Sequence, residues 1–280
     1  MRSHRCSDRP AQETDQRACS KMSDSDEDFT ANTPQYRKWK PHTSLKGTSE
    51  DDFEYLKVLG QGGYGDVVMV RAKKSKQLYA MKIIKRSGVL QGHYFQEEAD
   101  ILKRLDHPYI VKLAHHFRPK DKKYKDVLCL VMELVRGSTF AKVFAARNFN
   151  KRKRLRHPLP EDTARFYLSQ LVAVIDYLHK EGIVYRDLKP DNFMLREDGN
   201  ICLLDFGVSF QLKRVLQRMG TRIGADGFKA PEMLTSKNQG YGKEVDWWNL
   251  GIVAYMLLSG KHPFRSLFGG KLDIRIAKIL

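Results

Sequence analysis

The sequence predicts an α+β chain built in two lobes, a strand-rich lobe followed by a helix-rich one. The prediction rests on a change in hydrophobic periodicity along the chain. Apolar patterning predicts strands over residues 53–59, 66–72, 77–84, 111–114 and 127–134, and a helix over residues 94–105. From Pro160 the apolar spacing becomes helical, over residues 161–180 and 245–259. The change in pattern places the boundary between the lobes near Arg136 and Gly137.

Residues 1–52 differ in composition from the rest, and we expect them to form a disordered polar and acidic tail. They contain few aliphatic residues and an acidic run at residues 23–28. We therefore place the folded domain at residues 53–280, with one lobe over about 53–135 and the other over about 136–280. The net charge is +17, but the tail carries nine basic and ten acidic residues, so the whole excess lies in the folded domain.

The composition argues against several classes of protein. No apolar run approaches the ~20 residues of a membrane helix, and we expect no membrane span. The four cysteines are scattered without a CxxC pair, which argues against a zinc site and for an intracellular, cytoplasmic location. Residues 118–126 and 147–156 are basic loops, either solvated or able to bind a polyanion, and the run from Lys151 to Arg154 also fits a nuclear-import signal. A base-stacking or groove-reading motif is missing, so nucleic acid is not an expected partner.

A glycine-rich stretch provides the first candidate site. It reads Gly60, Gln61, Gly62, Gly63, Tyr64, Gly65. Taken alone, a GxGxxG pattern fits a dinucleotide fold, a phosphate-covering loop or chance. In a dinucleotide fold the glycines open a helix, whereas here a β-branched strand sequence follows at residues 66–70. That context favours a strand–turn–strand, whose bare backbone N–H groups can approach a phosphate.

Lys82, in the strand predicted over residues 77–84, is the second candidate. A lysine in an apolar strand can simply extend its ammonium group to water. Glu98, however, shares a helix stripe with Leu102 and Leu105, so it faces inward where a charge needs a partner. Glu97 is rotated off that stripe. We therefore predict a Lys82–Glu98 pair that holds the ammonium group within reach of phosphate oxygens.

The third candidate is the stretch from Tyr185 to Asn192, followed by Asp205-Phe206-Gly207. Between Asn192 and Asp205, two short apolar runs flank an Asp-Gly turn, a pattern that predicts a hairpin. The open end of that hairpin would bring Asn192 and Asp205 together as oxygen ligands suited to Mg²⁺. Asp187 and Lys189 precede the same end, as a carboxylate base beside a cation.

With these motifs in place, the chain from about Phe53 to Leu280 resembles a eukaryotic protein kinase. The motifs are the glycine loop, the Ala80-Met81-Lys82 strand, the YRDLKPDN run at 185–192, the DFG run at 205–207 and the Ala-Pro-Glu run at 230–232. Tyr185 at the start of its motif and the VDWWNLG run at 245–251 resemble the AGC group of serine/threonine kinases. The resemblance implies a two-lobed kinase fold whose second lobe is incomplete, because the sequence stops at Leu280.

The resemblance also implies a role for each matched residue. The glycine loop would cover the phosphates of ATP, Lys82 would hold the α- and β-phosphates, and Glu98 would position Lys82. Asp205 and Asn192 would hold Mg²⁺, Asp187 would accept the proton of the substrate hydroxyl, and Lys189 would meet the γ-phosphate. Around the adenine it implies Val67, Ala80, Met132, Glu133, Val135 and Met194, with Glu133 and Val135 contributing backbone. A stack of Leu102, Leu113, Tyr185 and Phe206, anchored by Asp246, would connect the lobes.

The activation segment departs from the family pattern. Thr221 falls on the position that an upstream kinase phosphorylates in relatives, with Arg186 as the partner of the phosphate, but Phe210 stands where a helping lysine is common. Ala225 replaces a threonine whose hydroxyl bonds the catalytic Asp and Lys. Two functions follow as expectations. One is an ATP- and Mg²⁺-dependent kinase that phosphorylates Ser or Thr of protein substrates, and the alternative is a catalytically weak or inactive kinase-like binding module.

Overall fold

The computed structural model describes residues 48–62, 65–85, 94–120, 126–147, 158–214, 217–235 and 240–264. The chain divides into two compact units, Met1–Lys40 and Pro41–Leu280, and every described residue belongs to the second unit. The basic run at residues 151–154 and most of the expected tail lie outside the described residues. None of the described helices has the length and apolar character needed to cross a membrane.

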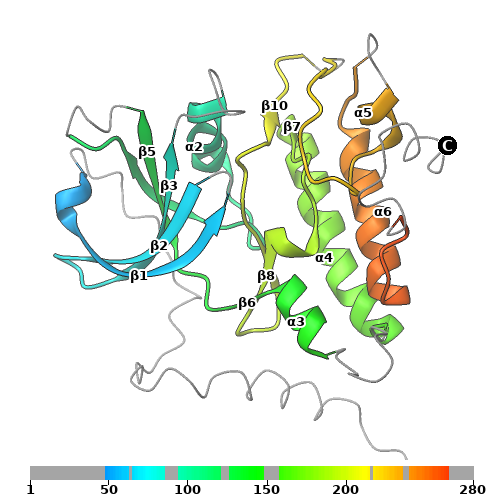
Figure 1. Cartoon of the computed structure of the whole chain (residues 1–280), viewed down its shortest axis with the longest axis horizontal. Coiled ribbons are helices and arrows are strands. Elements are labelled where there is room, and N and C mark those ends of the chain that lie inside the picture. The colour runs from blue at the N-terminus through cyan, green and yellow to red at the C-terminus, as the bar shows by residue number, and fades with distance from the viewer. Residues whose placement is uncertain are drawn as a thin grey trace, which may run out of the picture. The chain divides into compact units, whose positions relative to one another are not determined.

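The first lobe is a five-stranded antiparallel sheet, accompanied by one helix among the residues that the structure describes (Figure 1). Its strands, in the spatial order β1-β2-β3-β5-β4, are β1 Phe53–Gly62, β2 Gly65–Ala72, β3 Leu78–Lys85, β5 Val127–Glu133 and β4 Leu113–Phe117. Ahead of β1, Glu50–Asp52 form a short 3-10 helix, within the stretch that was expected to be a tail. Helix α2 spans Tyr94–Arg104, and the predicted stripe is buried at Ala99, Leu102 and Leu105.

The strand predicted over residues 111–114 was placed too early. Strand β4 begins at Leu113 because the residues before it are used elsewhere. Val111 donates its backbone N–H to the carbonyl oxygen of Leu203 at 3.0 Å, and Leu203 donates to the carbonyl oxygen of Tyr109 at 2.7 Å. This stretch therefore pairs with the second lobe and joins the two lobes through backbone hydrogen bonds.

The second lobe is mainly helical, with two small sheets (Figure 1). Its helices are α3 Phe140–Arg147, α4 Glu161–Lys180, α5 Pro231–Thr235 and α6 Glu244–Ser259. One sheet has the order β6-β8-β9 (Gly137–Thr139, Phe193–Arg196, Ile201–Leu203), and the other pairs β7 Ile183–Val184 with β10 Phe210–Gln211. A 3-10 turn, Pro190–Asn192, leads into β8. The predicted hairpin between Asn192 and Asp205 is thus β8–β9.

Helix α4 has the predicted bounds, and only some of its apolar residues are buried. Leu171, Ile175 and Leu178 are fully buried, whereas Phe166 and Val172 are 48% and 43% exposed. The buried residues of α4 recur at intervals of three and four, which keeps them on one face. Phe166 and Val172 are offset from that series by one or two residues, so they point away from the core.

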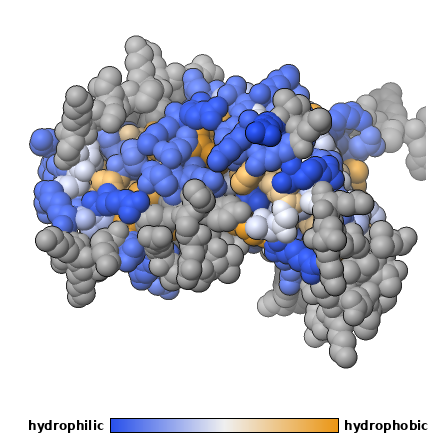
Figure 2. All heavy atoms as spheres, turned by 90° about the horizontal axis from the view of Figure 1, so that it is seen from above, coloured by the Kyte–Doolittle hydropathy of each residue, from blue (hydrophilic) through white to orange (hydrophobic). Residues whose placement is uncertain are grey.

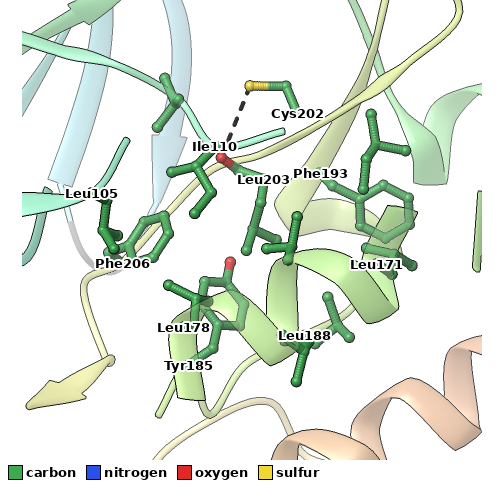
Figure 3. Close-up of a cluster of buried hydrophobic side chains, with 14 of the residues drawn as sticks. Leu105, Ile110, Leu171, Leu178, Tyr185, Leu188, Phe193, Cys202, Leu203 and Phe206 are labelled. Carbon is green, nitrogen blue, oxygen red and sulfur yellow. Dashed lines mark hydrogen bonds between the residues drawn. The ribbon is translucent and has the colours of Figure 1, made fainter. Parts of the chain in front are cut away.

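The largest hydrophobic core is continuous across both lobes. It includes Leu102 of α2, Leu130 of β5, Leu171 of α4 and Phe206, which follows Asp205. Figure 3 shows its centre, where the rings of Tyr185 and Phe206 lie among aliphatic side chains from several elements. By contrast, the described residues on the face shown in Figure 2 are mostly hydrophilic, with apolar residues visible only in places between them. The candidate site residues are therefore positioned by a shared apolar interior.

Candidate active site

Lys82 lies at the centre of a buried charge cluster. Its Nζ is 2.8 and 3.0 Å from the two carboxylate oxygens of Glu98, so the predicted pair forms. The same Nζ is 2.7 Å from Oδ1 of Asp205, a contact that the sequence did not indicate. Lys82 and Glu98 are almost fully buried, while the side chain of Asp205 is 32% exposed. One cation thus joins two carboxylates from different lobes.

Lys82, Glu98 and Asp205 shift one another's pKa values. The shifts keep Lys82 and Asp205, the most exposed member of the cluster, charged. Burial disfavours the charged form of Lys82, but the carboxylates of Glu98 and Asp205 outweigh it and raise the pKa of the ammonium group. Burial raises the pKa of Glu98, with Lys82 opposing that shift. For Asp205 the attraction of Lys82 outweighs burial and lowers the pKa. Asp205 is therefore a carboxylate at neutral pH.

Gly207 packs closely against this cluster. A Cβ atom at position 207 would lie 3.1 Å from Oδ1 of Asp205, 3.2 Å from Nζ of Lys82 and 3.3 Å from Oε2 of Glu98. Its backbone N–H also donates to Oδ1 of Asp205 at 3.2 Å. Oδ2 of Asp205 receives no hydrogen bond from any residue that the structure describes, which leaves one oxygen available to a divalent cation.

Asp187 lies at the centre of a second cluster, on the loop between β7 and β8. Its Oδ2 accepts hydrogen bonds from Nζ of Lys189 at 2.6 Å and from Nδ2 of Asn192 at 2.9 Å. Its Oδ1 accepts from the backbone N–H of Ala225 at 2.8 Å. Asn192 is also connected to the first cluster, because its carbonyl oxygen accepts from the N–H of Leu204, next to Asp205, at 2.8 Å.

The backbone N–H of Ala225, at the position where the sequence lacks a threonine hydroxyl, bonds the carboxylate of Asp187. Gly224 makes this approach feasible, since its φ is +103° and a Cβ atom there would lie 2.7 Å from the carbonyl oxygen of Arg186. Only glycine accommodates that combination of φ and proximity without strain. The segment that contains Gly224 and Ala225 therefore holds the carboxylate of Asp187 through its backbone.

A buried carboxylate, that of Asp246, anchors the loop that carries Asp187. Asp246 of α6 is fully buried, and its two oxygens accept the backbone N–H groups of Tyr185 and Arg186 at 2.9 and 2.7 Å. Oδ2 also contacts Nε2 of His179 at 2.8 Å. Arg186 adopts a positive φ of 69°, uncommon for a residue with a side chain, and these bonds hold it there.

The predicted stack between the lobes is present. The rings of Tyr185 and Phe206 meet edge to face, with centroids 5.2 Å apart (Figure 3). Leu102 belongs to the same buried cluster, and Leu113 packs against it. The hydroxyl of Tyr185 donates to the carbonyl oxygen of Leu204 at 3.1 Å, which ties the stack to the residue before Asp205.

Arg186 also contacts Thr221. Its Nη1 lies 3.2 Å from Oγ1 of Thr221, while its Nε donates to the carbonyl oxygen of Val208 at 2.6 Å. The ring of Phe210, at the position where a lysine is common in relatives, lies under the guanidinium group at 5.3 Å. Thr221 itself is exposed. A rigidly held cation thus stands beside an accessible hydroxyl.

The residues predicted around the nucleotide lie in the glycine-rich turn, on adjacent strands of the first lobe and beside the core that joins the lobes. Gly60, Gln61 and Gly62 end β1 and Gly65 begins β2, while Gly63 and Tyr64 lie outside the described residues. Strand pairing places Val67 opposite Lys82 and Ala80 opposite Met132, so these four positions lie on adjacent strands. Met132 and Met194 both pack against the core that joins the lobes, and Val135 is buried.

Two glycine-loop residues differ in why glycine is needed. Gly65 has a φ of +137°, and a Cβ atom there would lie 2.4 Å from the carbonyl oxygen of Ile83. A side chain at position 65 would therefore clash with the backbone of β3. A Cβ atom at Gly60 would meet nothing within 4 Å. The space around the Cβ position of Gly60 is therefore open.

Sequence reasoning missed the side chain of Glu133. We predicted only a backbone role, but the carboxylate is buried and forms two hydrogen bonds with Arg196, at 2.7 and 3.0 Å. The sequence contained one signal for this pair. Arg196 follows Met194 by two residues, and alternate residues of a strand lie on the same face. Arg196 therefore shares the face of Met194, which was predicted to lie near the adenine. The donation from Ala225 and the contact of Lys82 with Asp205 had no comparable signal.

Comparison with known proteins finds a matching family and related chains. The family model described as "Protein kinase domain" matches residues 53–277. The chain is 35% identical over 232 residues to the serine/threonine-protein kinase AtPK1/AtPK6 of Arabidopsis thaliana, covering 81% of this chain and 46% of that protein. It is 36% identical over 218 residues to the RAC-beta serine/threonine-protein kinase of Rattus norvegicus, covering 76% and 42%. It thus spans less than half the length of these relatives.

The charge cluster predicts a pH-dependent defect when its cation is removed. In Lys82→Met, the carboxylates of Glu98 and Asp205 lose the cation between them, so we expect the free energy of unfolding at pH 7.5 to fall by about 3–5 kcal/mol. The pKa of Glu98, already raised by burial, rises further. Because folding then takes up a proton, the difference from wild type should shrink as the pH falls toward 5.5. Urea unfolding at both pH values measures it.

The double variant Lys82→Met with Glu98→Gln provides the control. It lacks the buried acid, so its deficit should be smaller and independent of pH. An equal deficit for Lys82→Met at pH 7.5 and 5.5 would contradict the assigned coupling.

Proposed function

The chain belongs to the protein kinase family, and we propose from this premise that it is a serine/threonine kinase transferring the γ-phosphate of ATP to protein substrates. The observation that carries the proposal is the convergence of two clusters. Lys82, Glu98 and Asp205 form a cation site with an open carboxylate oxygen, and Asp187, Lys189 and Asn192 form a base site next to it. Phosphoryl transfer needs both, since its catalysis consists mainly of positioning and charge stabilisation.

The donor set fits Mg²⁺. Oxygen ligands from a carboxylate and an amide suit a hard divalent cation, and the lowered pKa of Asp205 keeps its carboxylate ionised. Asp205 and Asn192 would hold the ion, which would supply positive charge to neutralise that of the ATP phosphates. Lys82, freed from part of its contact with Asp205, would bind the α- and β-phosphates while Glu98 keeps its ammonium group in place.

In the reaction, the hydroxyl oxygen of a substrate Ser or Thr forms a bond to the γ-phosphorus as the bond to the β-phosphate bridging oxygen breaks, and ADP leaves. Asp187 accepts the hydroxyl proton. Lys189 stabilises the negative charge on the transferred group. Asn192 and the N–H of Ala225 hold the carboxylate of Asp187 in a fixed orientation.

Asp187 gives the direct test. Asp187→Asn keeps the side-chain shape but removes the base, and we expect the rate of transfer to fall by roughly 10²–10⁴. Transfer of radiolabelled γ-phosphate to a mixed peptide library measures it. Asp198→Asn, at an exposed position in the β8–β9 turn, is the matched control and should keep wild-type activity. If Asp187→Asn transferred phosphate as fast as wild type, the assigned base would be wrong.

Ala225 decides between the active kinase and the alternative of a catalytically weak or inactive binding module. Because the Ala225 N–H already bonds Asp187, adding a hydroxyl in Ala225→Thr should raise kcat by no more than about tenfold, the equivalent of one hydrogen bond. Ala225→Val matches the shape of Thr without its hydroxyl and serves as control. A rise above roughly a hundredfold for Thr, but not Val, would show that wild type is disabled and would favour the binding module.

Thr221 is the proposed site at which an upstream kinase activates the enzyme. A phosphate there would add nearly two negative charges beside Arg186, whose Nη1 already lies 3.2 Å from Oγ1. We expect wild type phosphorylated at Thr221, verified by mass spectrometry, to exceed Thr221→Ala in kcat. Phosphatase-treated wild type is the control and should match Thr221→Ala. Equal kcat for the phosphorylated wild type and Thr221→Ala would show that the switch is unused.

A further inference from the structure

The covalent connection between the lobes is short and tightly fixed. Strand β5 ends at Glu133 and β6 begins at Gly137. Gly137 pairs with Arg196 across β6 and β8, with a φ of +136°. A Cβ atom at Gly137 would lie only 1.8 Å from the carbonyl oxygen of Leu195, so no other residue fits. The connection is thus attached to the β8–β9 hairpin at its second-lobe end.

The Glu133–Arg196 ion pair fixes the first-lobe end of this connection. Nη2 of Arg196 lies 2.7 Å from Oε1 of Glu133, and Nη1 lies 3.0 Å from Oε2. The side chains are only 15% and 8% exposed. Two parallel charge-assisted bonds of this kind restrict orientation as well as distance. The ion pair therefore closes a ring over the three residues between Glu133 and Gly137.

Further bonds extend the pair to a third segment. Oε1 of Glu133 accepts the backbone N–H of Lys112 at 3.0 Å, and the N–H of Glu133 donates to the carbonyl oxygen of Lys112 at 2.9 Å. Nη2 of Arg196 also contacts Sγ of Cys202 at 3.0 Å. Burial raises the pKa of the Cys202 thiol, which leaves Glu133 as the anion in contact with Arg196.

The two partners belong to elements on opposite sides of the nucleotide site. Strand β5, which ends at Glu133, pairs with β3 so that Leu130 lies opposite Lys82. Arg196 ends β8, the strand that carries Met194 and follows Asn192 directly. A change in the geometry of the pair would move Lys82 relative to Asn192.

We propose that the Glu133–Arg196 pair is a positioning clamp that fixes the angle between the lobes and thereby sets the affinity for ATP. The inference rests on the proposed kinase function. Neither side chain needs to touch the nucleotide; the pair acts through the spacing between β3 and β8. A buried ion pair contributes little net stability compared with apolar residues, so geometry rather than unfolding free energy is where its effect should appear.

The experiment uses the full chain and two variants. The double variant Glu133→Gln with Arg196→Gln removes both charges at once and leaves no buried charge without a partner. Arg196→Lys keeps the charge but loses the paired geometry. The double variant Glu161→Gln with Arg165→Gln, which removes an exposed ion pair within α4, is the matched control. The measurements are KM for ATP, KM for peptide, kcat, the Kd for ADP with Mg²⁺ by calorimetry, and the thermal unfolding midpoint.

We expect KM for ATP and Kd for ADP to rise about tenfold in the Glu133/Arg196 double variant, with KM for peptide unchanged. A tenfold change corresponds to about 1.4 kcal/mol. Arg196→Lys should shift both values in the same direction by less, and the Glu161/Arg165 control should behave as wild type. This split between ATP and peptide is the sign of positioning, because a purely structural loss would lower the folded fraction and leave both KM values alone.

An ATP KM at the wild-type value in the double variant would overturn the clamp, as would equal rises in both KM values. If the double variant failed to fold, wild-type KM for ATP in Arg196→Lys would overturn it. Absence of phosphate transfer by the wild type would instead count against the proposed function. In that case the Kd for ADP still tests the clamp, since it requires no transfer.

Discussion

The carboxylate of Asp246 is the contact on which the rest of the site depends. It is fully buried in α6 and accepts two consecutive backbone N–H groups, from Tyr185 and Arg186, at 2.9 and 2.7 Å. Those bonds hold Arg186 at a positive φ, which sets the direction of the chain into Asp187. Because α6 is packed in the core, the loop inherits the rigidity of a helix. The orientation of Tyr185, and with it the stack to Phe206, follows from the same attachment.

Charged residues of the first lobe complete the site. Lys82 bonds both Glu98 on its own side and Asp205 on the other, so the electrostatic centre of the site is also a contact between lobes. The Glu133–Arg196 pair is a second ion pair between the lobes, at the short connection between β5 and β6. The backbone hydrogen bond between Val111 and Leu203 is an uncharged contact between the same two lobes. The relation of the lobes therefore rests on a few directional bonds together with the shared apolar core.

Much of this arrangement could be predicted from the sequence because its signals are local. Periodicity gave α2, α4, α6 and most strands, and helical phase singled out Glu98 over Glu97 as the inward acid. Contacts between distant segments could not be read in this way. The placement of β4 depends on Leu203, ninety residues further on, and the buried state of Glu133 depends on Arg196. Ala225 suggested a lost hydroxyl contact, yet its own N–H makes a bond to Asp187, which only the path of the backbone reveals.

The Lys82–Asp205 contact joins residues 123 positions apart in the chain. Closing a loop of that length has an entropic cost that must be met before the contact stabilises anything, whereas the bonds between Asp187, Lys189 and Asn192 span at most five residues. The order of folding should follow this difference: the base site can form with the second lobe alone, and the cation site only when both lobes have docked. A nascent or partly folded chain would therefore hold its base in place without being able to grip a nucleotide.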